Sequence, residues 1–209
     1  MNLDITINDY LKELSSTAPT PGGGNVAALS AVLASALGVM VCNLTIGKKK
    51  YAAVEEEFKI LQVRLEHIQE EFTMLAYRDN AAFDAVMECY KLPKDTDEQK
   101  SLRTLKIDDA TFYAAEVPYE VMEKCNELLP LLVTCIERGY VNSLSDAGVA
   151  VSLVNTAMQG AYFNVLINCS SLNDRSKGNE LLIKATSLYN KLKKESQKIN
   201  DEIIQRLSK

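Results

Sequence analysis

The stretch VAALSAVLASALGVMVCNLTI, residues 26–46, decides the fold, and it lies in a longer run between Glu13 and Lys48 that contains no charged residue. About 20 apolar residues followed by three lysines also fit a membrane-spanning helix with a positively charged flank. However, Ala, Ser and Gly outnumber Leu and Ile here, and small residues are typical of helices that pack closely inside a protein core. A helix that is apolar on every side must be covered by other elements, so we expect a buried helix over residues 25–46 and no membrane partner.

A second uncharged stretch lies between Asp146 and Asp174. Ser143 and Asp146 have the S-x-x-D spacing of a capping box, which predicts a helix start there. Two apolar helices among amphipathic ones predict an all-α, single-domain multihelical bundle over residues 1–209, with the two uncharged helices buried at its centre. Because such helices need cover on every side, a chain of this size is expected to form a homodimer.

The rest of the chain is also predicted to be helical, because apolar residues recur three and four positions apart and no run alternates with a period of two. Thr96 and Gln99 form a capping box. Pro118 suits the first turn of a new helix, Pro130 predicts a kink in it, and Gly139 predicts its end. The expected amphipathic helices cover residues 7–15, 51–90, 96–115, 118–139 and 177–207.

Composition argues against several classes of protein. The net charge of −5 and the pI near 5.1 disfavour nucleic acid as a partner. Residues 1–4 carry no basic group before the apolar stretch, so a secretory leader is not expected and the protein is assigned to the cytoplasm. The five cysteines have neither zinc-site nor disulfide spacing and are predicted to be reduced core residues: Cys42, Cys89, Cys125, Cys135 and Cys169.

The loop PTPGGGN, residues 19–25, leads into the first uncharged helix. Its prolines fix the backbone, its glycines allow a ligand to approach closely, and the first turn of the helix presents unpaired N–H groups. Such a loop suits an anionic or electron-rich ligand. The candidate binding residues in it are Pro21, Gly22, Gly23, Gly24 and Asn25.

Several short motifs follow one another along nearly the whole chain: PTPGGGN at 19–25, NLTIGKKKY at 43–51, Asp79 with Ala82-Phe83, Leu92-Pro93, Val117-Pro118, SDAGVA at 145–150, Gly160-Ala161, Asn164-Val165 and Ile167-Asn168. In this order they resemble the cyclodeaminase/cyclohydrolase family. It contains the single-domain methenyltetrahydrofolate cyclohydrolases and the cyclodeaminase part of formiminotransferase-cyclodeaminase. The chain departs from the family at Gly139-Tyr140, where Gly-Asn is common.

The resemblance implies an all-α homodimer that acts at the carbon bridging N5 and N10 of tetrahydrofolate. A cyclohydrolase hydrolyses 5,10-methenyltetrahydrofolate to the 10-formyl form, whereas a cyclodeaminase converts the 5-formimino form to 5,10-methenyl with loss of ammonia. Neither reaction needs a metal or redox cofactor, because the carbon is already electrophilic. A third possibility is a helical folate-binding or assembly module without turnover.

Two carboxylates are candidates for catalysis. Asp146 lies at the start of an uncharged helix, where burial would raise its pKa and the helix N-terminus would lower it; its alternative role is a helix cap. Asp79 is the second candidate, and its alternative role is a partner for Arg78 on a solvated helix face.

Polar residues next to apolar segments are candidates for binding folate. Asn43, Asn164 and Asn168 could hydrogen-bond the pterin or be satisfied core asparagines, since a buried amide without partners costs about 1–3 kcal/mol. Lys48 and Lys49, with Lys50, could bind the glutamate tail or form an ordinary solvated helix end. His67 is the only histidine and lies outside every motif, which excludes schemes based on a catalytic histidine.

Overall fold

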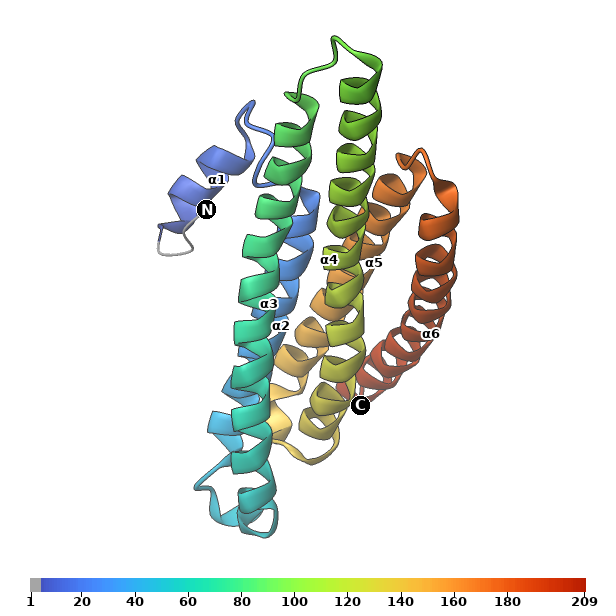
Figure 1. Ribbon diagram of the computed structural model, residues 1–209. Coiled ribbons are helices and arrows are strands. Elements are labelled where there is room, and N and C mark those ends of the chain that lie inside the picture. The colour runs from blue at the N-terminus through green and yellow to red at the C-terminus, as the bar shows by residue number, and fades with distance from the viewer. Residues whose placement is uncertain (1–4) are drawn as a thin grey trace.

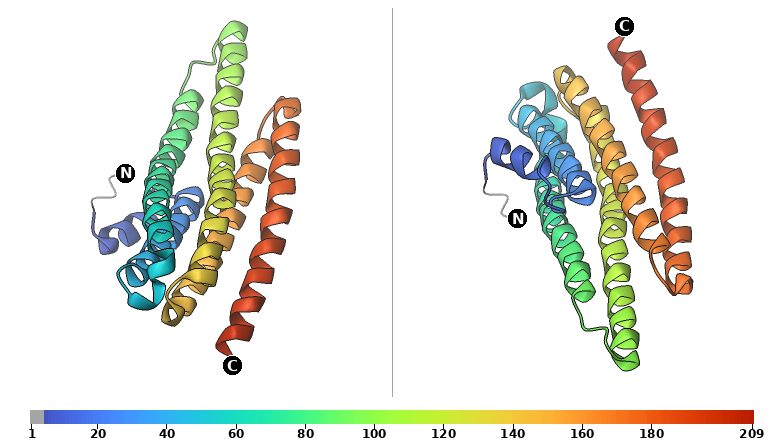
Figure 2. Two further views of the ribbon diagram at one scale, coloured as in Figure 1. Left: turned by 90° about the horizontal axis from the view of Figure 1, so that it is seen from below. Right: turned by 90° about the horizontal axis from the view of Figure 1, so that it is seen from above.

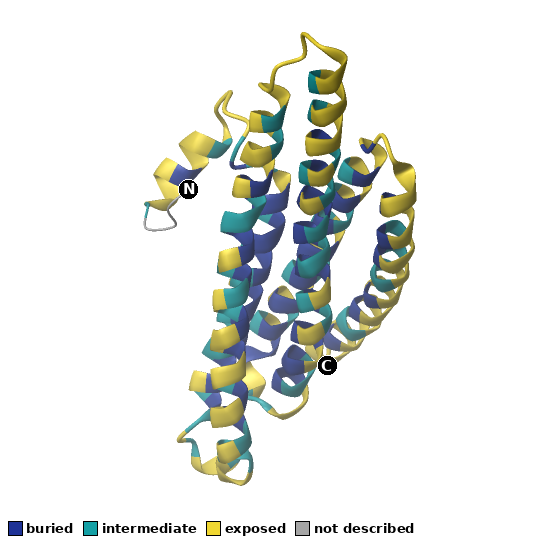
Figure 3. Cartoon of the chain, in the orientation of Figure 1, coloured by how far each residue is buried: buried dark blue, intermediate teal, exposed yellow. Residues whose placement is uncertain are grey.

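The two uncharged stretches form two helices that pack against each other and lie at the back of the bundle in the view of Figure 1. In the computed structural model, which describes residues 5–209, helix α2 spans Gly23–Thr45 and helix α5 spans Leu144–Ser170. Helix α2 packs against α3, α4 and α5, while α5 packs against α2, α4 and α6. Buried residues concentrate where these helices face one another (Figure 3).

The other elements are also helical, and residues 5–209 contain no strand. The prediction of an all-α, single-domain bundle is therefore confirmed. Figure 2 shows that α1 and α6 lie at opposite edges of the bundle. Residues 1–4, on which the argument about a leader depends, lie outside the described residues. The remaining elements are α1 Ile7–Leu14, the 3₁₀ turn Lys49–Val54, α3 Glu55–Tyr90, α4 Asp97–Arg138, the 3₁₀ turn Val141–Ser143 and α6 Arg175–Leu207.

Small residues let the central helices approach closely, as the sequence predicts. A Cβ placed on Gly160 of α5 would lie 3.0 Å from Cβ of Ala27 on α2. One on Gly38 would lie 2.9 Å from a methyl group of Leu132. Among the described residues, α2 is the one helix that is long and apolar enough to cross a membrane. However, 56% of its most apolar 18-residue segment is buried inside the bundle, and the core helix of a soluble protein can have the same length and composition.

The prediction of two separate helices, the second starting at Pro118, is wrong for the segment that forms α4. This segment is a single helix of 42 residues with Pro118 and Pro130 inside it. An internal proline costs about 3 kcal/mol because it removes a hydrogen bond and crowds the carbonyl four residues before it. Burial on both sides of Pro118, at Val117 and Val121, favours the continuous helix.

One predicted cap is present and the other is wrong. The Thr96–Gln99 capping box is formed, with Thr96 accepting from the Gln99 N–H and the Gln99 side chain bonding back. Ser143 does not cap α5; its hydroxyl donates to the carbonyl of Tyr140 at 2.7 Å. A 3₁₀ turn leads directly into α5, so Ser143 lacks the extended backbone that an N-cap needs.

Candidate active site

A cavity of about 400 Å³ lies where α2 begins and α5 ends, between these two helices, α3 and α4. The glycine loop forms one wall. Among the predicted site residues, Gly22, Gly23, Gly24, Asp79, Asn164 and Asn168 line it. The other lining residues are Pro19, Thr20, Phe83, Val86, Met87, Tyr90, Thr111, Ala114, Ile167 and Ser171.

The carboxylate of Asp79, on α3, lies against the first turn of α2. A Cβ on Gly24 would lie 2.1 Å from Oδ1 of Asp79, so only glycine leaves room for the carboxylate. The backbone N–H of Asn25 donates to Asp79. Gly22, the residue before α2, has no side chain to cap the helix, and Asp79 satisfies one of the N–H groups that the helix start leaves open.

Burial raises the pKa of Asp79 to about 6, although the hydrogen bond from Asn25 acts in the opposite direction. A carboxyl with such a pKa exchanges a proton near neutral pH, as a general acid or base must. The predicted alternative, a solvated Asp79 paired with Arg78, is wrong. Arg78 donates from Nη2 to Glu120 at 2.8 Å, while Asp79 faces the cavity.

The side chain of Asn25 supports the loop from behind. Its Oδ1 accepts from the hydroxyl of Tyr10 at 2.9 Å and its Nδ2 donates to the carbonyl of Ala76 at 2.8 Å. These bonds tie α1 and α3 to the start of α2. The amide therefore holds the loop in place, and its own backbone N–H is the group that reaches the site.

Asn164 and Asn168 face the cavity from the last turns of α5. Asn164 Nδ2 donates to the carbonyl of Gly160 at 2.9 Å, and Asn168 Nδ2 donates to the carbonyl of Ala114 at 2.7 Å. The second bond has a specific cause: Ala114 lies four residues before Pro118, which has no N–H to offer it. With one N–H of each amide engaged, the remaining N–H and the oxygen can bind a ligand.

The apolar wall of the cavity was not predicted from the sequence. Phe83, Val86, Met87 and Tyr90 follow Asp79 on α3 at intervals of 4, 7, 8 and 11 residues. These intervals place them on the same helix face as Asp79. Apolar residues at helical spacing after Asp79 were therefore a sequence signal that could have identified this wall.

Other predicted site residues lie elsewhere in the chain. Asn43 is exposed near the end of α2, about 30 Å along the helix from Gly23, and accepts from Nε2 of Gln62 at 3.1 Å. Asp146 is partly buried at the start of α5, about 27 Å along that helix from Asn164. One chain therefore does not bring Asp146 together with Asp79.

The predicted lysines lie beyond the far end of α2. The ammonium of Lys48 lies 4.1 Å from the ring centroid of Tyr140, and Lys49 is exposed. Tyr140, the departure from the family motif, thus has a defined contact in this chain. Pro21 is buried in the loop and does not line the cavity.

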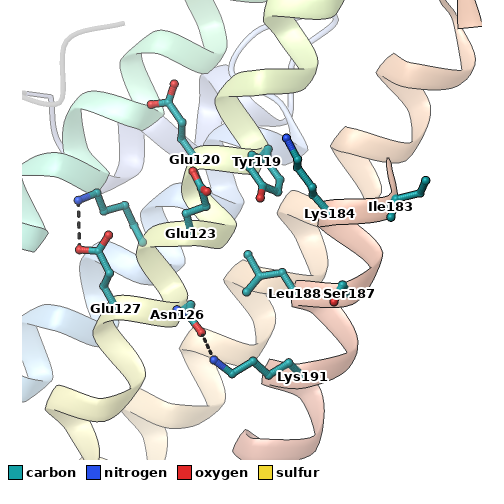
Figure 4. A pocket seen from close by; sticks show the side chains of 11 residues that line it. Tyr119, Glu120, Glu123, Asn126, Glu127, Ile183, Lys184, Ser187, Leu188 and Lys191 are labelled. Atoms are coloured by element: carbon teal, nitrogen blue, oxygen red, sulfur yellow. Dashed lines mark hydrogen bonds and ion pairs between the residues drawn. The ribbon is translucent and has the colours of Figure 1, made fainter. Parts of the chain in front are cut away.

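A wider cavity of about 720 Å³ lies between α4 and α6 (Figure 4). Two of its lysines have partners within the cavity: Lys191 donates to Asn126 at 2.9 Å, and Lys124 to Glu127 at 3.2 Å. No carboxyl there is held against a helix start as Asp79 is. The loop cavity is therefore the better candidate for an active site.

The remaining reactive side chains lie outside the cavity. Cys42, Cys125, Cys135 and Cys169 are buried, as predicted, whereas Cys89 is only partly buried. Within residues 5–209 no three His, Cys, Asp or Glu side chains gather in a way that could hold a metal ion. His67 is exposed on α3.

Comparison with known proteins identifies the family. The family model for formiminotransferase-cyclodeaminase matches residues 6–187. A methenyltetrahydrofolate cyclohydrolase of Methylorubrum extorquens is 44% identical over 177 residues, which are 85% of each chain. A formimidoyltransferase-cyclodeaminase of Mus musculus is 33% identical over 82% of this chain, which spans only 32% of that longer protein.

A solved structure has the same fold. The crystal structure of a formiminotetrahydrofolate cyclodeaminase from Thermotoga maritima superposes with a TM-score of 0.80 at 27% identity, over 96% of this chain and 98% of the other. The family expected from the sequence motifs is confirmed. The chain belongs to the formiminotransferase-cyclodeaminase family.

Proposed function

We propose that the protein is a methenyltetrahydrofolate cyclohydrolase, which hydrolyses 5,10-methenyltetrahydrofolate to 10-formyltetrahydrofolate. The observation that carries the proposal is Asp79, a carboxyl with a pKa of about 6 held at the wall of an apolar cavity. The relative from Methylorubrum extorquens, which matches this chain over most of both lengths, supports the choice of reaction.

In this reaction Asp79 is the general base. At neutral pH it is mostly ionised, and it accepts a proton from water as the water oxygen attacks the methenyl carbon. The tetrahedral intermediate then breaks its bond from carbon to N5, N5 takes a proton, and the hydroxyl loses its proton to form the formyl group. The balance is one water consumed and one proton released. Asn164 and Asn168 supply the amide groups that orient the pterin.

A cyclodeaminase is the second candidate, and the fold of the Thermotoga maritima enzyme favours it. Here N10 attacks the formimino carbon, and the carbon–nitrogen bond to the leaving group breaks as ammonia departs. Protonated Asp79 would donate to that leaving nitrogen. A pKa of about 6 leaves a minor fraction of the carboxyl protonated at neutral pH, so the same site serves either reaction.

The absorbance of methenyltetrahydrofolate tests both candidates with the purified protein. A cyclohydrolase makes the absorbance fall when methenyltetrahydrofolate is the substrate. A cyclodeaminase makes it rise when 5-formiminotetrahydrofolate is supplied. A rate equal to that without protein in both assays would refute an enzymatic role in this chemistry.

We also propose that two copies associate through the uncovered faces of α2 and α5. Leu33 on α2, and Val149 and Phe163 on α5, are all more than half exposed. Exposed apolar faces on uncharged helices suit a second copy of the same surface.

A cytoplasmic location, the lack of a cofactor and the lack of nucleic-acid or membrane partners stay predictions from the sequence.

A further inference from the structure

The cavity becomes more open from its floor to its outer end. Its floor is formed by Gly24, which is buried, and Asp79. Along α3 the exposed fraction is 38% at Phe83, 41% at Met87 and 50% at Tyr90, with Val86 less exposed between them. Tyr90 ends α3 about 16 Å from Asp79 along the helix and marks the outer end of the cavity.

Arg103, on the facing helix α4, does not line the cavity but contacts Tyr90, the lining residue at this outer end. Its Nη2 and Nε donate to the carbonyl of Tyr90 at 3.0 and 3.3 Å, and the centre of the guanidinium lies 5.4 Å from the centroid of the Tyr90 ring. Two of its five N–H groups are used in this way, and three are left. No ion pair joins Arg103 to a carboxylate in residues 5–209.

We propose that Arg103 binds a carboxylate of the glutamate tail of folate and thereby selects glutamylated substrates. This inference rests on the proposed function. Folate carries a pterin, an aminobenzoyl ring and a glutamate in a line, and the reacting carbon lies between the first two. With that carbon at Asp79, the charged glutamate must extend toward solvent, because burying its carboxylates in the floor would be costly.

The side chains along this path match the parts of the ligand. Phe83, Val86 and Met87 give the aminobenzoyl ring an apolar wall. Arg103 then offers a fixed fork of donors to the carboxylate, the geometry that makes guanidinium groups selective for it. Lys48 and Lys49, the sequence-based candidates for the tail, lie beyond the opposite end of α2 and do not reach this position in the same chain.

The test compares two substrates of the unaltered protein: 5,10-methenyltetrahydrofolate and the corresponding tetrahydropteroate, which lacks the glutamate. We expect the KM for the pteroate to be about ten times higher or more, because the pteroate lacks the carboxylate that Arg103 binds. We expect kcat to stay within about twofold, because this contact is the same in the bound substrate and in the transition state. Equal KM values for the two substrates would overturn the proposal without any variant being needed.

Arg103→Gln should remove this difference. We expect its KM to rise about tenfold or more for the glutamylated substrate and to stay unchanged for the pteroate. Arg103→Lys, which keeps the charge but loses the fork, should give an intermediate ratio and serves if the first variant does not fold. The matched control is Arg64→Gln, which removes the same charge from an exposed position on α3 outside the cavity.

Two results would contradict the inference in different ways. An equal loss on both substrates in Arg103→Gln would mean that Arg103 acts only by positioning Tyr90. Turnover of neither methenyltetrahydrofolate nor 5-formiminotetrahydrofolate by the unaltered protein would refute the proposed function itself, and the inference with it.

Discussion

At the scale of single residues, the proposed chemistry depends on the carboxyl of Asp79. Asp79→Asn keeps an oxygen that can accept the N–H of Asn25 but removes the proton-transfer group. We expect turnover to fall by roughly 10²-fold or more, with the helical circular dichroism unchanged. Asp146→Asn, at the far end of α5, is the matched carboxyl change and should alter turnover far less. Near-normal turnover in Asp79→Asn would remove Asp79 from the mechanism.

The raised pKa of Asp79 also predicts how stability depends on pH. Its pKa rises from 3.8 to about 6 on folding, so the folded protein holds this proton more tightly than the unfolded chain does. The resulting stabilisation is fully present below about pH 4 and is lost as the pH rises through about 6. Asp79→Asn lacks this term. The thermal midpoint of Asp79→Asn minus that of the unaltered protein should therefore increase from pH 4 to pH 8. If this difference is the same at both pH values, the pKa of Asp79 is not raised.

Two adjacent glycines offer a matched pair of substitutions. In Gly24→Ala the added Cβ would lie 2.1 Å from Oδ1 of Asp79, so the carboxylate must turn away from the Asn25 N–H. In Gly23→Ala the nearest side-chain atom, Nδ2 of Asn164, is 3.8 Å away, which is ordinary contact. We expect turnover to fall about tenfold or more in the first variant and by only a few-fold in the second. Equal turnover in the two variants would contradict this placement of Asp79.

At the scale of the elements, Pro118 in α4 and Asn168 in α5 are expected to be coupled. Asn168→Ala leaves the carbonyl of Ala114 without its 2.7 Å partner and should cost about 1–3 kcal/mol. In a Pro118→Ala background the new backbone N–H can bond that carbonyl, so the same change should cost less. A double-mutant cycle by chemical denaturation measures the difference. Additive costs would mean that Asn168 does not compensate for the proline.

Pro118 and Asn168 also explain why the sequence wrongly predicted two helices where the structure has the single helix α4. Pro118 is a locally correct signal for a helix start, but its cost is offset by packing at Val117 and Val121 and by an amide 50 residues later in the chain. Such a partner is visible only once α5 lies beside α4. By contrast, the bounds of α2 and α3 follow from local signals, namely the glycine loop, the missing charges and the apolar stripe, and these elements were predicted closely.

At the scale of the whole molecule, helix direction decides which predicted residues share a site. The glycine loop lies at the start of α2 and Asn164 near the end of α5, and the two helices run antiparallel, so these segments meet at the cavity. The helix lengths alone already separate Asn43 from the loop, and Asp146 from Asn164, by about 27–30 Å. The sequence could thus exclude a single-chain site containing all of them, but pairing Asp79 with the loop required the packing of α3 on α2.

The uncovered faces of α2 and α5 lead to the last prediction, which concerns association. A dimer has an expected mass of 46.2 kDa, twice the 23.1 kDa of the chain. Leu33 is 52% exposed on the uncharged helix α2, and Leu33→Glu would place a charge where the proposed partner surface is apolar. Burying an unpaired charge is costly, so the variant should have the monomer mass by light scattering at micromolar concentration. Ile60→Glu is the control, since Ile60 is also an exposed apolar residue, at 65%, but lies on the charged helix α3. A monomer mass for the unaltered protein, or an equal effect of both substitutions, would rule out this interface.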